Sequence, residues 1–373
     1  MRIVMLCSGH AVNDARVTYK EARTLARAGH EVIVFGQGPT NLEDIPSVSL
    51  RPLLPEGKGW LKRVRMCIKL YRVAMPCQPD VIVCHEFESA ITGLILKLRH
   101  GIKMVFDSHE CYEETLSWRM PKPLRPIVRV IIIAILKSIV SRSDRVIAVT
   151  PPNQEFLSTM RKDGRVDILH NSPPMEHFPP CNHNIDGPIT VVHEGILYRQ
   201  RGLVQMLEAV AIARRKKDIR FLIIGRVKPE DQELFDEKVS QLGLSDAMII
   251  PGWRPWEEIG QIESQAQIGL IGLQYAPNSY KSLNNKFYNY MSCGQPVIGP
   301  TGSVTADMIR KYDCGLCVDT SKPEEIADAI GRLVEDVELR KRFGANGRKA
   351  IEEELGWHVM EKKLQRIYRE LEN

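Results

Sequence analysis

The sequence predicts an α/β protein built from two domains of the same kind, each a parallel sheet covered by helices. The chain has 373 residues, which is too long for one compact core. Short runs rich in Val and Ile alternate with segments of helical periodicity, a pattern typical of parallel sheets. After about residue 188 this alternation starts again instead of continuing. The same plan is therefore used twice.

Each expected strand is a short apolar run that follows a helical segment. In the first half these runs are 2–6, 31–35, 81–84, 103–106 and 145–149. In the second half they are 189–193, 220–224, 248–250, 268–271 and 296–298. Residues 170–188 are rich in Pro, Asn and Asp, which favour a linker. We expect one domain over 1–175, a second over 176–355, and a helix over 356–373 that packs back on the first.

Composition excludes several classes of protein. The net charge is +5, too small to indicate a nucleic-acid binder, although residues 1–180 carry 25 basic and 18 acidic groups (+7) and the remainder 26 and 28 (−2). The longest apolar stretch, 130–136, is far shorter than the ~20 residues of a bilayer span. Nine Cys without paired spacing and no signal-peptide pattern favour the cytosol over secretion.

Three familiar site patterns are absent or incomplete. There is no GxxxxGK[ST] phosphate loop, and Gly36-Gln37-Gly38 lacks the third glycine that opens a helix in nicotinamide-binding domains. Cys314 and Cys317 form one C-x-x-C without a companion pair, so two buried small residues explain them better than a metal or redox site.

Polar residues follow two expected strands of the first half. Ser8, Gly9 and Asn13 form an expected flexible turn after the first strand, and Asp107, His109 and Glu110 follow the strand 103–106. The carboxyl edge of such a sheet faces the ligand crevice. A plain strand–helix turn and a hydrogen-bonded surface histidine are the alternatives.

Basic residues follow two expected strands of the second half. Arg199, Arg201 and Gly202 form a turn before an amphipathic helix, and Lys286 lies early in a later helix. Guanidinium donors together with a helix N-terminus suit a diphosphate. The alternative for the first turn is a solvated basic loop. Two such positions on one sheet edge predict a pocket for a nucleoside diphosphate.

An ordered set of segments gives a family resemblance over nearly the whole chain. The segments are DARV…EARTLARAGHEV, VFDSHE, the GIL…RG turn, FLIIGR, IPGW and NKFYNYMSCGQPVI. In this order they resemble the GT-B glycosyltransferases, in particular the retaining family 4. The resemblance implies two Rossmann-like domains facing across a cleft. It also implies a nucleotide sugar bound mainly by the C-terminal domain and an acceptor bound mainly by the N-terminal one.

The resemblance also assigns roles to residues. The implied catalytic residues are His109, Arg201 and Lys286. The implied donor-binding residues are Gly9, Arg199, Gly202, Arg226, Trp253, Asn285, Asn289 and Tyr290. The implied acceptor-binding residues are Asn13, Arg16 and Glu110, and no metal ligands are expected.

The chain departs from the family pattern at three positions. Ile196 stands where an Arg is common, and Arg199 is expected to supply the missing charge. Lys281 and Asn289 stand where many members have a pair of glutamates, and a neutral amide binds a ribose hydroxyl less strongly than a carboxylate does. The departures leave the donor and the extent of activity open.

The implied reaction is retaining and independent of metal and of any cofactor, with a UDP- or GDP-linked sugar as donor. The cations and helix N-termini would stabilise the leaving diphosphate. The alternatives are a nucleotide-sugar epimerase of the same fold and a catalytically impaired partner of another transferase. Donor sugar, base, acceptor and linkage stay open.

Two basic apolar segments suggest an anionic membrane surface as a partner. In 60–75, the residues Leu61, Val64, Ile68 and Tyr71 share one helical face and Lys or Arg fill much of the rest, a pattern that suits anionic lipid. For 124–140 a core-facing helix is the favoured interpretation. We expect a cytoplasmic enzyme, peripheral on the inner face of the cell membrane, that uses a lipid-linked glycan acceptor and no nucleic acid.

Overall fold

A computed structural model describes residues 1–38, 45–54 and 59–372, and divides them into two compact units. Unit 1 comprises Met1–His170 with His358–Asn373, and unit 2 comprises Asn171–Trp357. The unit boundary thus lies within the proline-rich segment, where Met175–His177 (η4) is a short 3₁₀ turn. The last helix, α15 (Trp357–Glu372), belongs almost entirely to unit 1, where Arg145 pairs with Glu370 at 2.6 Å.

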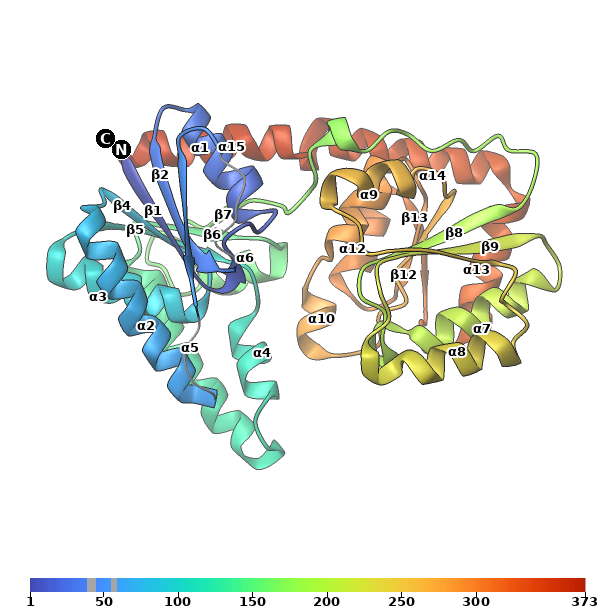
Figure 1. Ribbon diagram of the computed structural model, residues 1–373, viewed down its shortest axis with the longest axis horizontal. Coiled ribbons are helices and arrows are strands. Elements are labelled where there is room, and N and C mark those ends of the chain that lie inside the picture. Colours follow the sequence, from blue (N-terminus) through green and yellow to red (C-terminus); the bar gives the residue numbers. More distant parts are fainter. Residues whose placement is uncertain (39–44, 55–58, 373) are drawn as a thin grey trace. The chain divides into compact units, whose positions relative to one another are not determined.

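Unit 1 contains a seven-stranded parallel sheet in the order β3-β2-β1-β4-β5-β6-β7. Its strands are β1 (Arg2–Ala11), β2 (Glu31–Gln37), β3 (Val48–Leu53), β4 (Val81–Cys84), β5 (Lys103–Ser108), β6 (Arg145–Ala148) and β7 (Asp167–Ile168). Its other helices are η1 (Val17–Ala22), α1 (Arg23–Arg27), α2 (Gly59–Ala74), η2 (Met75–Cys77), α3 (Phe87–His100), α4 (Tyr112–Trp118), η3 (Lys122–Leu124), α5 (Arg125–Arg142) and α6 (Pro151–Ser158). Figure 1 shows α2, α3 and α5 on one face of this sheet.

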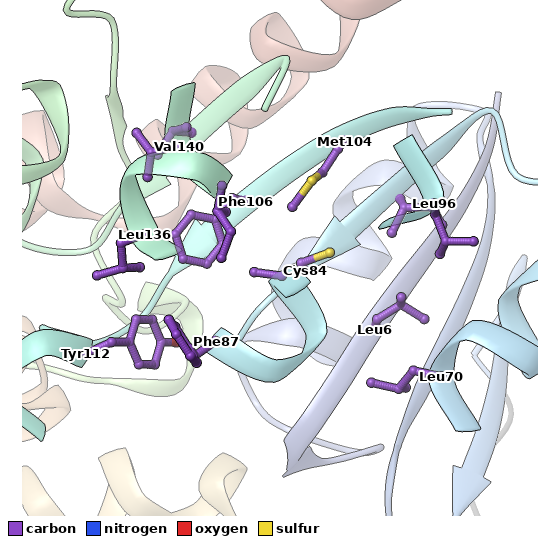
Figure 2. Packing of buried hydrophobic residues seen from close by; sticks show 14 of the residues in the cluster. Leu6, Leu70, Cys84, Phe87, Leu96, Met104, Phe106, Tyr112, Leu136 and Val140 are labelled. Atoms are coloured by element: carbon purple, nitrogen blue, oxygen red, sulfur yellow. The ribbon is translucent and has the colours of Figure 1, made fainter. Parts of the chain in front are cut away.

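The core of unit 1 lies between the sheet and these three helices. Figure 2 shows Leu6, Cys84 and Phe106 from neighbouring strands together with helix residues of the same buried cluster, such as Leu70 and Leu136. These side chains are almost fully buried, and burying each stabilises the fold by about 1.5–3 kcal/mol. This packing therefore holds the carboxyl ends of β1, β4 and β5 in fixed positions.

Unit 2 repeats the plan with a six-stranded parallel sheet in the order β10-β9-β8-β11-β12-β13. Its strands are β8 (Ile189–Glu194), β9 (Ile219–Ile224), β10 (Met248–Gly252), β11 (Ile268–Leu270), β12 (Val297–Pro300) and β13 (Gly315–Val318). Its other helices are η5 (Arg199–Arg201), α7 (Leu203–Arg214), η6 (Pro229–Asp231), α8 (Gln232–Gln241), α9 (Trp256–Glu263), α10 (Pro277–Lys281), α11 (Asn285–Ser292), α12 (Val304–Tyr312), α13 (Pro323–Glu335), α14 (Val337–Ala350) and η7 (Ile351–Leu355).

The predicted α/β class with two Rossmann-like domains is confirmed, and each of the ten expected strands is present with ends shifted by a few residues. Three strands were not predicted: β3, β7 and β13. Each lies at an end of its sheet, where a strand pairs on one side only and needs no continuous apolar run. The expected flexible turn at Ser8 and Gly9 was wrong, because β1 continues to Ala11.

Helix α2 exposes part of the face that was expected to meet lipid, whereas α5 follows its expected core-facing arrangement only in part. In α2, Met66, Leu70 and Ala74 enter the core, whereas Val64 and Ile68 are about half exposed. Leu61 and Lys62 lie outside the residues whose side chains the structure describes. In α5 only the second half follows the core-facing interpretation; its first turns expose Ile127, Val130 and Ile131.

No helix in the described part of the chain combines the length and the apolar character needed to cross a bilayer. All nine cysteines are free thiols, and Cys314 is buried while Cys317 is partly so.

Candidate functional site

Unit 2 carries a cluster of basic side chains at the carboxyl ends of β8 and β11, which we call the cation site; it is a candidate site for an anion. β8 is followed by the 3₁₀ turn Arg199–Arg201 and by Gly202, where α7 begins. Gly202 has a φ of +81°, and a β-carbon there would lie 1.9 Å from the carbonyl oxygen of Gly272. Only glycine fits this close approach. The first N–H groups of α7 have no acceptor within the helix and add positive potential next to the turn.

Arg201 and Lys286 converge on one point in this site. A β-carbon built on Gly195 would lie 3.3 Å from Nη1 of Arg201 and 3.7 Å from Nζ of Lys286. The two residues also line one small cavity with His193 and Asn284. They reach it from neighbouring strands, because β11, which precedes α11, pairs with β8. The predicted proximity of these two cations is present in unit 2.

Lys286 is a buried amine that is poised to titrate. Its side chain is 7% exposed, and burial together with the charge of Arg201 lowers the pKa of Lys286 to about 7. Nδ1 of His193 faces the carbonyl of Leu270 at 3.3 Å, so this nitrogen carries the hydrogen. Nε2 of His193 then accepts from Nζ of Lys286 at 3.4 Å. An arriving anion would therefore meet an amine that gains a proton readily.

Arg199 does not join this pair. Its Nε donates to Asp231 at 2.9 Å, and its backbone N–H donates to the same carboxylate at 3.1 Å. The expectation that Arg199 replaces the arginine missing at position 196 is therefore not supported, because its charge is already matched on η6. Ile196 itself is partly exposed.

A second cavity of about 320 Å³ adjoins the cation site. Arg226 and Trp253 line it, as predicted for a donor site, and the Trp253 ring is 73% exposed. Its lining residues are Glu194, Gly195, Ile196, Ile224, Gly225, Arg226, Trp253, Arg254 and Ile259. Isoleucines and an exposed indole beside charged groups suit a planar base attached to a polar sugar.

Glu194, the last residue of β8, is a carboxylate of this site that the sequence analysis did not single out. Asn289 donates from Nδ2 to Oε2 of Glu194 at 2.8 Å. Burial raises the pKa of Glu194, and the charge of Lys286 and this hydrogen bond oppose the rise. The amide at position 289 therefore orients a carboxylate that β8 contributes. A charged residue at the end of the apolar run 189–193 was the signal in the sequence.

The other predicted donor residues of unit 2 have structural partners. Tyr290 is fully buried, and its hydroxyl accepts from the N–H of Glu194 at 3.0 Å. It therefore positions Glu194 and is not exposed to a ligand. Oδ1 of Asn285 accepts from Asn171 at 2.8 Å.

A further buried carboxylate, Glu263, lies near Glu194. Both of its carboxylate oxygens are buried and have no hydrogen-bond partner. Burial, followed by the charge of Glu194, raises the pKa of Glu263 well above the usual range.

Unit 1 has its own polar cavity at the end of β1. Backbone N–H groups of Ser8, Gly9 and His10 donate to the carboxylate of Glu86 at 2.7, 3.1 and 2.8 Å. These bonds explain why β1 stays extended here. Although burial opposes it, the hydrogen bond and charge of Glu86 raise the pKa of His10 to about 9. Burial likewise opposes the effect of His10, which lowers the pKa of Glu86 to about 2.

His109 stands between this cavity and a buried ion-pair cluster. Its Nε2 bonds to Asp107 at 2.8 Å, and its side chain is 10% exposed. Burial lowers the pKa of His109 to about 4 against the pull of Asp107, so the imidazole is neutral at pH 7. Because Nε2 donates the single ring hydrogen to Asp107, Nδ1 of the neutral ring is an uncharged hydrogen-bond acceptor.

Arg16 belongs to the cluster and not to the cavity. It is 3% exposed, contacts Glu21 at 2.7 Å and Asp107 at 3.1 Å, and donates to the carbonyl of Leu169. The acceptor-binding role predicted for Arg16 is therefore replaced by a structural one. Ligand atoms of Glu21, His85, Asp107 and His109 lie within 4.8 Å of one another, but Arg16 already sits against both carboxylates.

The cavity of unit 1 has a volume of about 500 Å³. Gly9, His109 and Glu110 of the predicted set line it, together with His10 and Glu86. Gly9 therefore shares a cavity with His109 and Glu110, and its contact with the donor stays a prediction. Asn13 is exposed but is not among the lining residues. The remaining lining residues are Ser8, Gln37, Arg63, Met66, Glu88, Tyr112, Thr115, Leu116 and Arg119.

Two family models match successive parts of the chain. Residues 180–350 match the family model of glycosyl transferases group 1, and residues 15–174 match that of glycosyltransferase family 4. The chain is 21% identical over 428 aligned positions to an MMP α-(1→4)-mannosyltransferase of Mycolicibacterium hassiacum, covering 99% of this chain and 98% of the relative.

Solved structures show the same fold. Sucrose-phosphate synthase from Thermosynechococcus elongatus superposes with a TM-score of 0.80 at 18% identity, covering 100% of this chain and 99% of that one. Anabaena HepE in complex with UDP superposes with a TM-score of 0.76 at 13% identity, covering 99% and 100%.

Proposed function

Because the chain belongs to the GT-B glycosyltransferases and resembles family 4, we propose that it is a retaining, metal-independent transferase. In this proposal it moves a sugar from a nucleoside-diphosphate sugar to a hydroxyl of a lipid-linked glycan. Its product would serve cell-surface polysaccharide or glycolipid synthesis. The observation that carries the proposal is the meeting of Arg201 and Lys286 beside Gly195.

The reaction follows from the charges of unit 2. As the bond between the anomeric carbon and the diphosphate oxygen breaks, negative charge grows on that oxygen. Arg201, protonated Lys286 and the N-terminus of α7 stabilise this charge more in the transition state than in the bound donor. The acceptor hydroxyl attacks from the same face and passes its proton to the leaving diphosphate. No enzyme nucleophile is then needed, and three positive groups take the place of a metal ion.

The donor nucleoside would occupy the adjacent cavity. An exposed indole and isoleucines offer a surface for the base, and Glu194 lies where a ribose diol would meet it. The bound UDP of the HepE structure supports a uridine donor, and GDP is the alternative to be compared with it. On the acceptor side, we assign the cavity of unit 1, with neutral His109 and exposed Glu110 in contact with the glycan.

A transfer assay tests the proposal. The protein is incubated with UDP- and GDP-linked sugars and lipid-linked acceptors extracted from membranes, and the product is analysed by mass spectrometry and by the anomeric coupling constant in NMR. Transfer with retained configuration, undiminished by EDTA, is expected. A changed sugar released without acceptor would identify an epimerase. Binding of UDP or GDP without turnover of any acceptor would identify a catalytically impaired partner.

Donor binding is expected to weaken as the pH rises above 7. A bound diphosphate raises the pKa of Lys286 from about 7, so above pH 7 binding takes up a proton and the affinity falls by up to tenfold per pH unit. Below pH 7 the amine is already charged and this dependence ends. Titration calorimetry with UDP and GDP between pH 6 and 9 measures the slope. Lys286→Met should flatten it; an equally steep slope in that variant would exclude Lys286 as the source.

Glu194→Gln is expected to remove discrimination between ribose and deoxyribose. A hydrogen bond to a charged group contributes about 1.5–3 kcal/mol, so wild type should bind UDP or GDP about 10- to 150-fold more tightly than its 2′- or 3′-deoxy analogue. The variant should bind both forms with similar, weaker affinity. Glu230→Gln, an exposed carboxylate on η6, is the matched control. Equal discrimination in Glu194→Gln and wild type would place the ribose elsewhere.

A further inference from the structure

Unit 1 exposes several large apolar side chains along one segment, and its core does not explain them. The segment runs over residues 118–131, from the end of α4 through η3 into the first turns of α5; we call it the α4–α5 tip. Its exposed large apolar side chains are Trp118 (50%), Met120 (37%), Leu124 (48%), Ile127 (61%), Val130 (67%) and Ile131 (52%). Single exposed apolar residues are ordinary, but a run of six marks an interaction surface. Figure 1 shows the α4–α5 connection as a projecting end of unit 1.

All charged side chains of the tip are basic. Residues 118–131 contain Arg119, Lys122, Arg125 and Arg129 and no Asp or Glu. Arg125 stacks on the Trp118 ring at 4.0 Å from its centroid, and Arg129 reaches back to Glu114 of α4 at 3.3 Å. The basic groups are therefore spread among the apolar ones and not gathered on an opposite face.

This combination fits an anionic lipid surface. Apolar side chains enter the boundary between headgroups and acyl chains, while Lys and Arg remain with the lipid phosphates. Each basic group close to an anionic surface contributes about 1 kcal/mol, and an amphipathic indole favours the interface. The cationic character without any acid distinguishes the tip from a neutral apolar patch for a second protein chain.

The tip leads directly to the cavity of unit 1. Thr115, Leu116 and Arg119 line that cavity and belong to α4 or to the residue that follows it. Arg63 and Met66 line it from α2, the helix that also exposes Val64 and Ile68. A lipid lying beside the tip would therefore present its headgroup next to His109 and Glu110.

We propose that the α4–α5 tip docks unit 1 on an anionic bilayer, so that a lipid-linked acceptor enters the cavity of unit 1 from the membrane. The docking stands on the surface alone, whereas the delivery of an acceptor rests on the proposed transferase function. The sequence pointed first to α2 for this contact and to 124–140 as a second one; in our proposal the centre lies at the α4–α5 tip.

Vesicle flotation tests the docking. The full chain is mixed with vesicles of phosphatidylcholine alone or with 30% phosphatidylglycerol. Wild type should float with the anionic vesicles and only weakly with neutral ones. Ile127→Ser/Val130→Ser/Ile131→Ser should reduce binding at least tenfold, and Lys122→Gln/Arg125→Gln about 30-fold at low salt. Ile95→Ser/Leu98→Ser on α3, two exposed apolar residues outside the tip, is the control and should bind like wild type.

Several results would overturn the docking. They are equal binding to neutral and anionic vesicles, unchanged binding of the tip variants, or equal loss in the α3 control. Concentration-dependent self-association that the tip variants abolish, without vesicle binding, would assign the tip to a second copy of the chain. Unchanged UDP or GDP affinity and circular dichroism of each variant show that it is folded.

A two-acceptor assay separates this inference from the proposed function. Tip variants should lose activity towards a vesicle-embedded acceptor and keep it towards a water-soluble short-chain analogue. Equal loss towards both acceptors would exclude delivery from the membrane. If wild type transfers sugar to neither acceptor but floats as expected, the transferase proposal fails and the docking stands.

Discussion

Replacing Arg201 with Ala is expected to lower the kcat of sugar transfer by about 10²- to 10³-fold, the usual cost of removing one preorganised donor from a developing charge. Arg201 and Lys286 lie next to the same Gly195 position from neighbouring strands. Without the guanidinium, only Lys286 and the N-terminus of α7 would face the leaving diphosphate. Steady-state kinetics with saturating acceptor measure kcat, and calorimetry measures the accompanying loss of UDP or GDP affinity.

Arg199→Ala is the matched control for Arg201→Ala, because both residues lie in the same 3₁₀ turn. Arg199 is paired with Asp231 and its side chain is 63% exposed, so its loss should change kcat by less than about threefold, in line with the small worth of an exposed pair. A loss in Arg199→Ala as large as in Arg201→Ala would mean that the whole turn had moved. Undiminished transfer by Arg201→Ala would refute its assigned role.

Arg16→Met is expected to destabilise unit 1 by about 3–5 kcal/mol, because breaking a buried ion pair leaves an uncompensated charge. Asp107 and Glu21 would both lose their guanidinium partner inside the protein. Hydrogen exchange of the β4 and β5 amides, followed by mass spectrometry, reports the free energy of opening of this unit. The fall in protection should be largest there.

The control for Arg16→Met is Arg2→Met, which breaks an ion pair with Glu31 in the same sheet. Both members of that pair are well exposed, so the cost should stay below about 1 kcal/mol. Equal exchange in the two variants would show that Arg16 contributes no more than a surface arginine. Unchanged UDP or GDP affinity in both would confirm that unit 2 is unaffected.

The sequence was most informative where one local pattern determines the structure. Strands such as β4 and β8 are buried on both faces and are therefore recognisable as apolar runs. β3 contains Arg51 and Pro52, and β13 begins with glycine and is only partly buried over its first three residues, so both offer a weaker run. Their position depends on a neighbouring strand and not on their own composition.

The candidate sites show the same limit. The proximity of Arg201 and Lys286 could be predicted from the sequence, because each follows a strand and the carboxyl ends of parallel strands share one edge. The burial of Arg16 could not be predicted, because its partners Asp107 and Leu169 lie 91 and 153 residues away in the chain. Glu86 and Glu194 were missed although each follows or ends an apolar run, the signal that had drawn attention to Asp107.

The backbone N–H groups that bind the Glu86 carboxylate determine how a charged ligand would interact with the cavity of unit 1. Three amide hydrogens and the imidazolium of His10 already saturate that carboxylate. The wall it forms is thus hydrophilic without acting as a source of negative potential. An acceptor that carries phosphate near its sugar would consequently meet no repulsion from this side.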